Sequence, residues 1–114
     1  MFVVEASGSF HRCRDFIDQH FTQLKSLHEI AERLNLRSPY LCRLFRKMGY
    51  PSPFQYLTHK KLARAAEMLV VDGKSVKEVA AAVGYNDAYH FSRVFKAHYG
   101  KSPTHFVKSA IGQN

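Results

Sequence analysis

The sequence has 114 residues, 46% of them hydrophobic, which is long enough for one domain or two small lobes with a modest core. Its 17 Lys and Arg outnumber 9 Asp and Glu, and the net charge of +8 favours a polyanionic partner, either nucleic acid or a membrane surface. No apolar run approaches the roughly 18 to 20 residues that cross a bilayer, and the N-terminus lacks a signal-peptide pattern, so we expect a cytoplasmic protein with no membrane partner.

The first nine residues, 1–9, combine a short apolar start with small residues, which predicts a linker or the remnant of an upstream segment. Beyond them, apolar side chains recur at steps of three and four residues, the spacing of an amphipathic helix. We expect this helix to begin at Phe10, with Ser9 as a candidate cap, and to cover the unit that follows. Its apolar positions are Phe10, Cys13, Phe16, Ile17, Phe21 and Leu24.

A short helix is predicted next, because Ser26 and Glu29 have the spacing of a capping box, in which each side chain binds the other residue's backbone N–H. Asn35 follows, and asparagine tolerates the left-handed backbone that ends many helices. A second helix must then start at Arg37 or Ser38, with proline acceptable in its first turn. Helix, short turn, helix is the outline of a helix-turn-helix unit.

This second helix separates an apolar face from a basic face. Its period points Leu41, Leu44, Phe45 and Met48 inward. The outward positions are Pro39, Cys42, Arg43, Arg46 and Lys47.

Residues 49–53 (Gly-Tyr-Pro-Ser-Pro) end that helix, and no helix-breaking residue follows from Phe54 to about Val70. This predicts a long connecting helix of about 25 Å, at 1.5 Å per residue. We assign five phenylalanines on inward stripes to the core: Phe45, Phe54, Phe91, Phe95 and Phe106.

The second half of the chain repeats the first. Ser75 and Glu78 form another capping-box pair at an offset of 49 from Ser26 and Glu29, whereas Arg93 follows Arg43 by 50. One extra residue therefore lies between Tyr85 and Arg93, at the turn or at the start of the second outward-facing helix.

Asn86 is a plausible cap for that helix, and its outward positions are Ala88, Tyr89, Ser92, Arg93 and Lys96. Gly100 ends it, Ser102 and Pro103 start a last short helix through Phe106, and we expect residues 108–114 to form a tail.

Two helix-turn-helix outlines joined by one long helix, together with three segments of the second half, carry a family resemblance. These segments read Gly84-Tyr85, then Phe-Ser-Arg-Val-Phe-Lys at 91–96, then Gly-Lys-Ser-Pro-Thr-His-Phe at 100–106. From about Phe10 to Val107 the chain resembles the DNA-binding domain of the AraC/XylS family of bacterial transcription regulators. It departs from the family pattern at Asn35, where glycine is usual, in the order Gly49-Tyr50, at Val107, where arginine is common, and in the position of Ser38-Pro39.

The resemblance implies an all-α fold of about seven helices, with helix-turn-helix lobes at 10–52 and 72–107 and a linker helix at 53–71. It also implies sequence-specific binding of double-stranded DNA and regulation of transcription, commonly as an activator that recruits RNA polymerase. An upstream effector-binding or dimerisation domain would then be a further partner.

Charge supports DNA binding independently, because the stretch from Arg33 to Ala66 holds eight basic residues and no acidic one. Arginine can donate two hydrogen bonds to one guanine, whereas lysine mainly neutralises phosphate. We expect base contacts from Pro39, Cys42, Arg43, Arg46, Ala88, Tyr89, Ser92 and Arg93, and phosphate contacts from Arg37, Ser38, Lys47, Asn86 and Lys96.

Other interpretations stay open at this level. The basic face could be merely solvated or could meet an acidic protein partner, as in a small helical adaptor, and Arg43 and Arg93 could form structural ion pairs with Glu29 or Glu78. We expect no cofactor, no metal site and no enzymatic activity, because no catalytic grouping can be assembled from these residues. Cys13 and Cys42 match no zinc spacing and are expected to be free thiols, with a redox role for Cys42 as a minor alternative.

Overall fold

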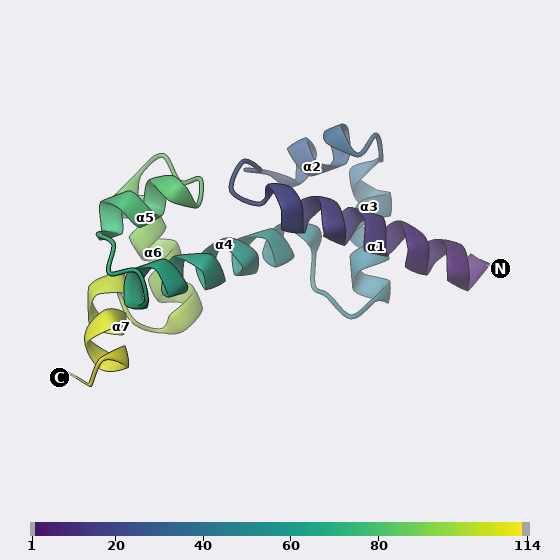
Figure 1. The fold of residues 1–114 in the computed structure, drawn as a ribbon. Coiled ribbons are helices and arrows are strands. Elements are labelled where there is room, and N and C mark those ends of the chain that lie inside the picture. The colour runs from purple at the N-terminus through teal and green to yellow at the C-terminus, as the bar shows by residue number, and fades with distance from the viewer. Residues whose placement is uncertain (1, 113–114) are drawn as a thin grey trace. The chain divides into compact units, whose positions relative to one another are not determined.

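The computed structural model describes residues 2–112, with side chains from Gly8 onward, and these residues form seven helices and no strand (Figure 1). The all-α prediction is confirmed. The helices are α1 (Phe2–His20), α2 (Leu27–Arg33), α3 (Ser38–Lys47), α4 (Pro53–Val70), α5 (Val76–Ala82), α6 (Ala88–Tyr99) and α7 (Pro103–Ala110).

The contacts divide the chain into two compact units, Met1–Lys60 and Lys61–Asn114, which we call the first and second lobe. The boundary lies inside α4, so the long helix belongs to both cores. Its first turns contribute Leu57 to the first core, and its residues from Leu62 onward contribute to the second.

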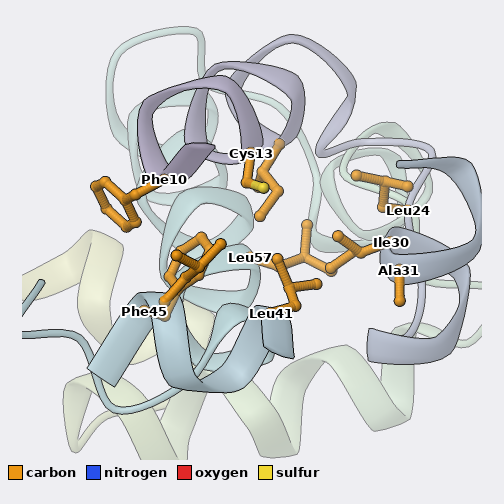
Figure 2. Packing of buried hydrophobic residues seen from close by; sticks show 10 residues of the cluster. Phe10, Cys13, Leu24, Ile30, Ala31, Leu41, Phe45 and Leu57 are labelled. Carbon is orange, nitrogen blue, oxygen red and sulfur yellow. The ribbon is translucent and has the colours of Figure 1, made fainter. Parts of the chain in front are cut away.

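The core of the first lobe lies between α1, α2, α3 and the start of α4 (Figure 2). Phe10 of α1 packs edge-on against Phe45 of α3 with ring centroids 4.9 Å apart, and Ile17 and Leu57 are fully enclosed. A polar link supports the same packing, because the Tyr56 hydroxyl donates a hydrogen bond to Asp18 of α1. Burial and that bond raise the pKa of Tyr56. The predicted role of the first helix as a cover for the unit that follows is confirmed.

The turn between α2 and α3 closes with two backbone hydrogen bonds. The N–H of Asn35 donates to the carbonyl of Glu32, and the N–H of Leu36 donates to that of Ala31, which is the Schellman pattern. Asn35 adopts φ of 57°, as predicted, and is the one described non-glycine residue with positive φ. An extended Arg37 then lets α3 begin at Ser38.

The second lobe repeats this plan with α5, α6, α7 and the C-terminal part of α4. Phe91 and Phe95 of α6 are fully buried, and Phe106 of α7 packs edge-on against Phe95 at 5.2 Å. Gly84 takes the place of Asn35, with φ of 98° and the same pair of turn hydrogen bonds.

The extra residue of the second copy lies in its turn. Leu36 and Tyr85 close equivalent turns at an offset of 49, whereas the caps Arg37 and Asp87 differ by 50. The inserted residue is therefore Asn86, and the cap that we expected from it is made instead by Asp87, whose carboxylate accepts a hydrogen bond from the Tyr89 N–H.

The repeated Ser-Pro pairs start helices in the same way. The Ser52 hydroxyl accepts from the Gln55 N–H at the start of α4, and the Ser102 hydroxyl accepts from the His105 N–H at the start of α7. A proline follows each serine, where its missing N–H costs nothing. The sequence similarity between these segments therefore reflects the same N-terminal cap on the helix that follows each outward-facing helix.

The capping boxes differ between the lobes. Ser75 and Glu78 form the complete reciprocal pair, which lowers the pKa of the Glu78 carboxyl. In the first lobe only half of the prediction holds: Ser26 accepts from the Glu29 N–H, but Glu29 accepts from the N–H of Lys25 instead.

Other predictions about local structure were wrong. Helix α1 begins at Phe2 rather than at Phe10, so the described part of residues 1–9 is helical and Ser9 is not a cap. Helix α7 continues to Ala110 rather than ending at Phe106, so residues 108–110 of the expected tail are helical, and its residues 113–114 lie outside the described residues. Met48 and Phe54, assigned to the core, are 36% and 46% exposed, because both lie at the helix ends flanking the 49–53 break, beyond the packed turns.

Candidate nucleic-acid interface

The outward face of α3 is basic and accessible. Pro39, Arg43, Arg46 and Lys47 are exposed, and Cys42 is half-buried beside them. Buried Leu41, Leu44 and Phe45 hold the opposite face in the first core. The sequence prediction of which α3 residues face outward is therefore correct for this set.

The start of α3 has no side-chain cap. Arg37 occupies the cap position, is exposed, and makes no capping hydrogen bond, while Ser38 is half-buried in the first turn. The first N–H groups of a helix point outward and carry the positive end of its dipole. A guanidinium at this end adds to that positive potential.

The alternative interpretation of the two repeated arginines as structural ion pairs finds no support. No ion pair among the described side chains includes Arg43 or Arg93. Glu29 accepts from the Lys25 N–H and Glu78 from the Ser75 N–H, so both carboxylates serve helix starts. The guanidinium of Arg93 instead lies 5.6 Å from the ring centroid of Tyr89.

The outward face of α6 has a different character. Tyr89 is 74% exposed, Arg93 and Lys96 are exposed, and Ser92 is half-buried. Ala88 is half-buried and packs against the second core, so it offers less surface than we expected. Asn86 lies exposed in the turn, next to the acidic cap Asp87.

Two side chains near these faces were missed by sequence reasoning. Tyr40 of α3 is 37% exposed, and its place between outward Pro39 and inward Leu41 made it hard to assign. Lys61 of α4 is only 4% exposed, with its ammonium nitrogen 5.2 Å from the Tyr85 ring centroid. Its position four residues after buried Leu57 is the available signal for burial, which the count of eight basic residues from Arg33 to Ala66 does not use.

Other kinds of site find no counterpart in residues 2–112. Among the described side chains, which begin at Gly8, no group of three or more His, Cys, Asp or Glu could hold a metal ion. Nor is any of the helices in that range both long enough and apolar enough for a membrane span. Cys13 and Cys42 are free cysteines, and burial raises the pKa of the Cys13 thiol.

Comparison with known proteins identifies the fold. A family model described as a helix-turn-helix domain matches residues 30–109, most of the chain and both outward-facing helices. The chain belongs to the AraC/XylS family, as a DNA-binding domain. Among AraC/XylS relatives, the raffinose operon transcriptional regulatory protein RafR of Pediococcus pentosaceus is 30% identical over 106 residues, which are 93% of this chain but 38% of that protein.

Solved structures agree. The C-terminal domain of AraT, a response regulator from Geobacillus stearothermophilus, is 33% identical with a TM-score of 0.80 over 88% of this chain and 84% of that one. The DNA-binding domain of AdpA, solved with a target DNA, shares the fold with a TM-score of 0.79 at 20% identity, over 92% of this chain and 97% of that one. The family is a class of DNA-binding transcription regulators rather than of enzymes.

Proposed function

We propose that this domain reads double-stranded DNA through the outward faces of α3 and α6, which would enter successive major-groove faces, and thereby regulates transcription. The observation that carries the proposal is the face of α3, where Arg43, Arg46 and Lys47 are exposed and no described ion pair neutralises them. A helix fits the major groove, and base edges there distinguish all four base pairs.

The arginines and the lysine of α3 would contact different parts of the DNA. Arg43 and Arg46 can each donate a bidentate pair of hydrogen bonds to guanine O6 and N7, whereas Lys47 can neutralise a phosphate as a point charge. At the start of α3, Arg37 and the uncapped N–H groups next to Ser38 favour another phosphate oxygen.

The α6 face would read DNA with fewer charges. Tyr89, Ser92 and Arg93 offer a ring, a hydroxyl and a guanidinium to base edges, with Lys96 toward the backbone. Asn86 is a weaker candidate for a phosphate contact than we expected, because the neighbouring Asp87 carboxylate repels one.

The wider setting is also part of the proposal. The chain spans 38% of the length of the raffinose regulator, so an effector-binding or dimerisation domain elsewhere in a longer protein would be consistent with its family. Activation is supported by relatives described as activators, such as the lactose operon transcription activator of Staphylococcus xylosus. Contact with RNA polymerase would be one route to such activation. A cytoplasmic location follows if its target is a bacterial chromosome.

A salt titration of DNA binding tests the central claim. The apparent affinity for duplex should fall about a thousandfold or more between about 50 and 200 mM salt if six or more phosphates are neutralised. Sites selected from random duplex should be bound more tightly than the unselected pool, measured by mobility shift at fixed salt. A flat salt response would remove the DNA proposal.

A further inference from the structure

A polar surface cavity lies between α1 and α3 in the first lobe. It has a volume of about 530 Å³ and is lined by Gly8, Ser9 and Arg12 of α1 and by Tyr40 of α3. Its described lining offers one guanidinium and two hydroxyl groups and no carboxylate. Such a set of donors suits an anion with several oxygens.

Helical geometry explains how α1 forms its side of the cavity. Phe10 and Cys13 are buried in the first core, so Ser9 and Arg12, one position before each, lie together along one flank of the helix. A side chain added at Gly8 would meet nothing within 4 Å, which leaves that wall open to an approaching ligand.

Helical geometry also places the cavity next to the bases that α3 would read. Tyr40 and Arg43 are three residues apart and are therefore neighbours on the surface of α3. Lys47, one turn beyond Arg43, continues the same flank. When Arg43 contacts a base edge, the sugar-phosphate backbone that borders the groove must pass close to this flank.

The charge at the cavity is not neutralised within the described part of the lobe. Arg12 is exposed and takes part in none of the ion pairs among the described side chains, whereas Arg14 of the same helix pairs with Asp15 at 3.8 Å. An unneutralised guanidinium beside a groove-reading helix favours phosphate.

We propose that Arg12, with the hydroxyls of Tyr40 and Ser9, binds one backbone phosphate of the DNA that α3 reads. The proposal rests on the proposed function and deepens it. It makes α1 part of the DNA-binding surface as well as a cover for the core. Because a phosphate carries no sequence information, this contact contributes affinity and register, equally for every base sequence.

The decisive experiment compares Arg12→Ala with Arg14→Ala by mobility shift over a salt series, on a selected site and on random duplex. Arg12→Ala should weaken binding to both duplexes on the order of tenfold at low salt and reduce the slope of log affinity against log salt by about 1. Arg14→Ala removes the same charge from the other flank of α1 and should leave the slope within about 0.3 of the starting protein, which is well below one phosphate.

Two conservative variants separate charge from geometry. Arg12→Lys should keep the salt slope, and Tyr40→Phe should weaken binding to both duplexes about threefold at unchanged slope, because it removes one neutral donor. Ethylation of a single backbone phosphate should impair binding by the starting protein but not by Arg12→Ala. Thermal melts of each variant establish that the first lobe is folded.

Several outcomes would overturn the inference. Equal slopes for Arg12→Ala and Arg14→Ala, with a steep salt response in the starting protein, would leave DNA binding intact and remove α1 from it. A saturable shift of the Arg12 Nε resonance on adding inorganic phosphate without DNA, combined with an unchanged salt slope of DNA binding for Arg12→Ala, would assign the cavity to a free anion. A flat salt response in the starting protein would instead defeat the proposed function itself.

Discussion

The two outward-facing helices occupy the same place in a repeated fold and present different chemistry. Buried Phe45 and Phe95 are equivalent, and the Ser-Pro pairs that follow them start α4 and α7 in the same way. On the outward side, however, α3 has arginine at its cap and α6 has aspartate. The repeat therefore preserves the packing and the Ser-Pro helix starts, whereas the caps and the outward surfaces of α3 and α6 differ.

A tyrosine near the end of each outward-facing helix also keeps its packing. The order is Gly49-Tyr50 in the first lobe and Tyr99-Gly100 in the second. Nevertheless, the ring of Tyr50 packs at 5.3 Å from that of Tyr56, and the ring of Tyr99 packs at 5.0 Å from that of Phe106. Helix α3 simply ends earlier, and Gly49 adopts φ of 93° to return the tyrosine to the core.

The largest expected effects come from the equivalent core phenylalanines. Phe45→Ala and Phe95→Ala should each lower the free energy of unfolding of their own lobe by about 3 to 5 kcal/mol, because each leaves a large cavity in a separate core. Amide hydrogen exchange followed by NMR can locate the loss of protection, with Phe54→Ala as a control at a half-exposed ring. Equal loss of protection in both lobes would mean that they unfold as one cooperative unit.

The next comparison concerns the equivalent arginines. Arg43→Ala and Arg93→Ala should each cost about 1 to 3 kcal/mol of DNA binding and relax base preference at one position, whereas Lys47→Ala should weaken all sequences about equally. We expect the larger loss of affinity from Arg43, because positive charge is denser around α3. Site selection from random DNA, repeated for each variant, measures both quantities.

An aromatic neighbour distinguishes the two arginines further. The Tyr89 ring lies beneath the Arg93 guanidinium, whereas the equivalent residue before Arg43 is Pro39. Tyr89→Ala should therefore weaken the base preference at the DNA position that Arg93 contacts. Pro39→Ala should leave the base preference at the position that Arg43 contacts unchanged. If Arg43→Ala or Arg93→Ala lowers the melting temperature and leaves base preference intact, these arginines are structural.

Most of the fold could be predicted from the sequence, because its signals are local and repeated. Apolar spacing located the helices, and the change of offset from 49 to 50 located the inserted residue near the second turn. The wrong predictions concern features that depend on contacts between distant parts of the chain. The choice between Asn86 and Asp87 as the cap depends on where the turn places its extra residue, and the exposure of Phe54 depends on what packs against the first turn of α4.

The candidate site was predictable to the same degree. The helical period identified Arg43, Arg46 and Lys47 as outward-facing, since this needs only the direction of the core. The cavity at Arg12 was not predictable, because it depends on how α1 crosses α3, which no spacing in the sequence records. Burial of Lys61 was missed although its spacing from Leu57 offered a signal, because its contact with the Tyr85 ring joins residues far apart in the sequence.

The smallest expected effects concern the two turn residues, Asn35 and Gly84, and they compare the energetic cost of asparagine in the two turns. Asn35 has φ of 57°, in the left-handed region that asparagine tolerates, whereas Gly84 has φ of 98°, outside that region. Asn35→Gly should therefore change the free energy of unfolding of the first lobe by less than about 0.5 kcal/mol, while Gly84→Asn should destabilise the second by about 1 kcal/mol. Urea denaturation followed by lobe-specific NMR signals measures both changes. A gain in stability from Asn35→Gly equal in size to the loss from Gly84→Asn would mean that the two turns tolerate asparagine alike and that the difference in φ has no energetic weight.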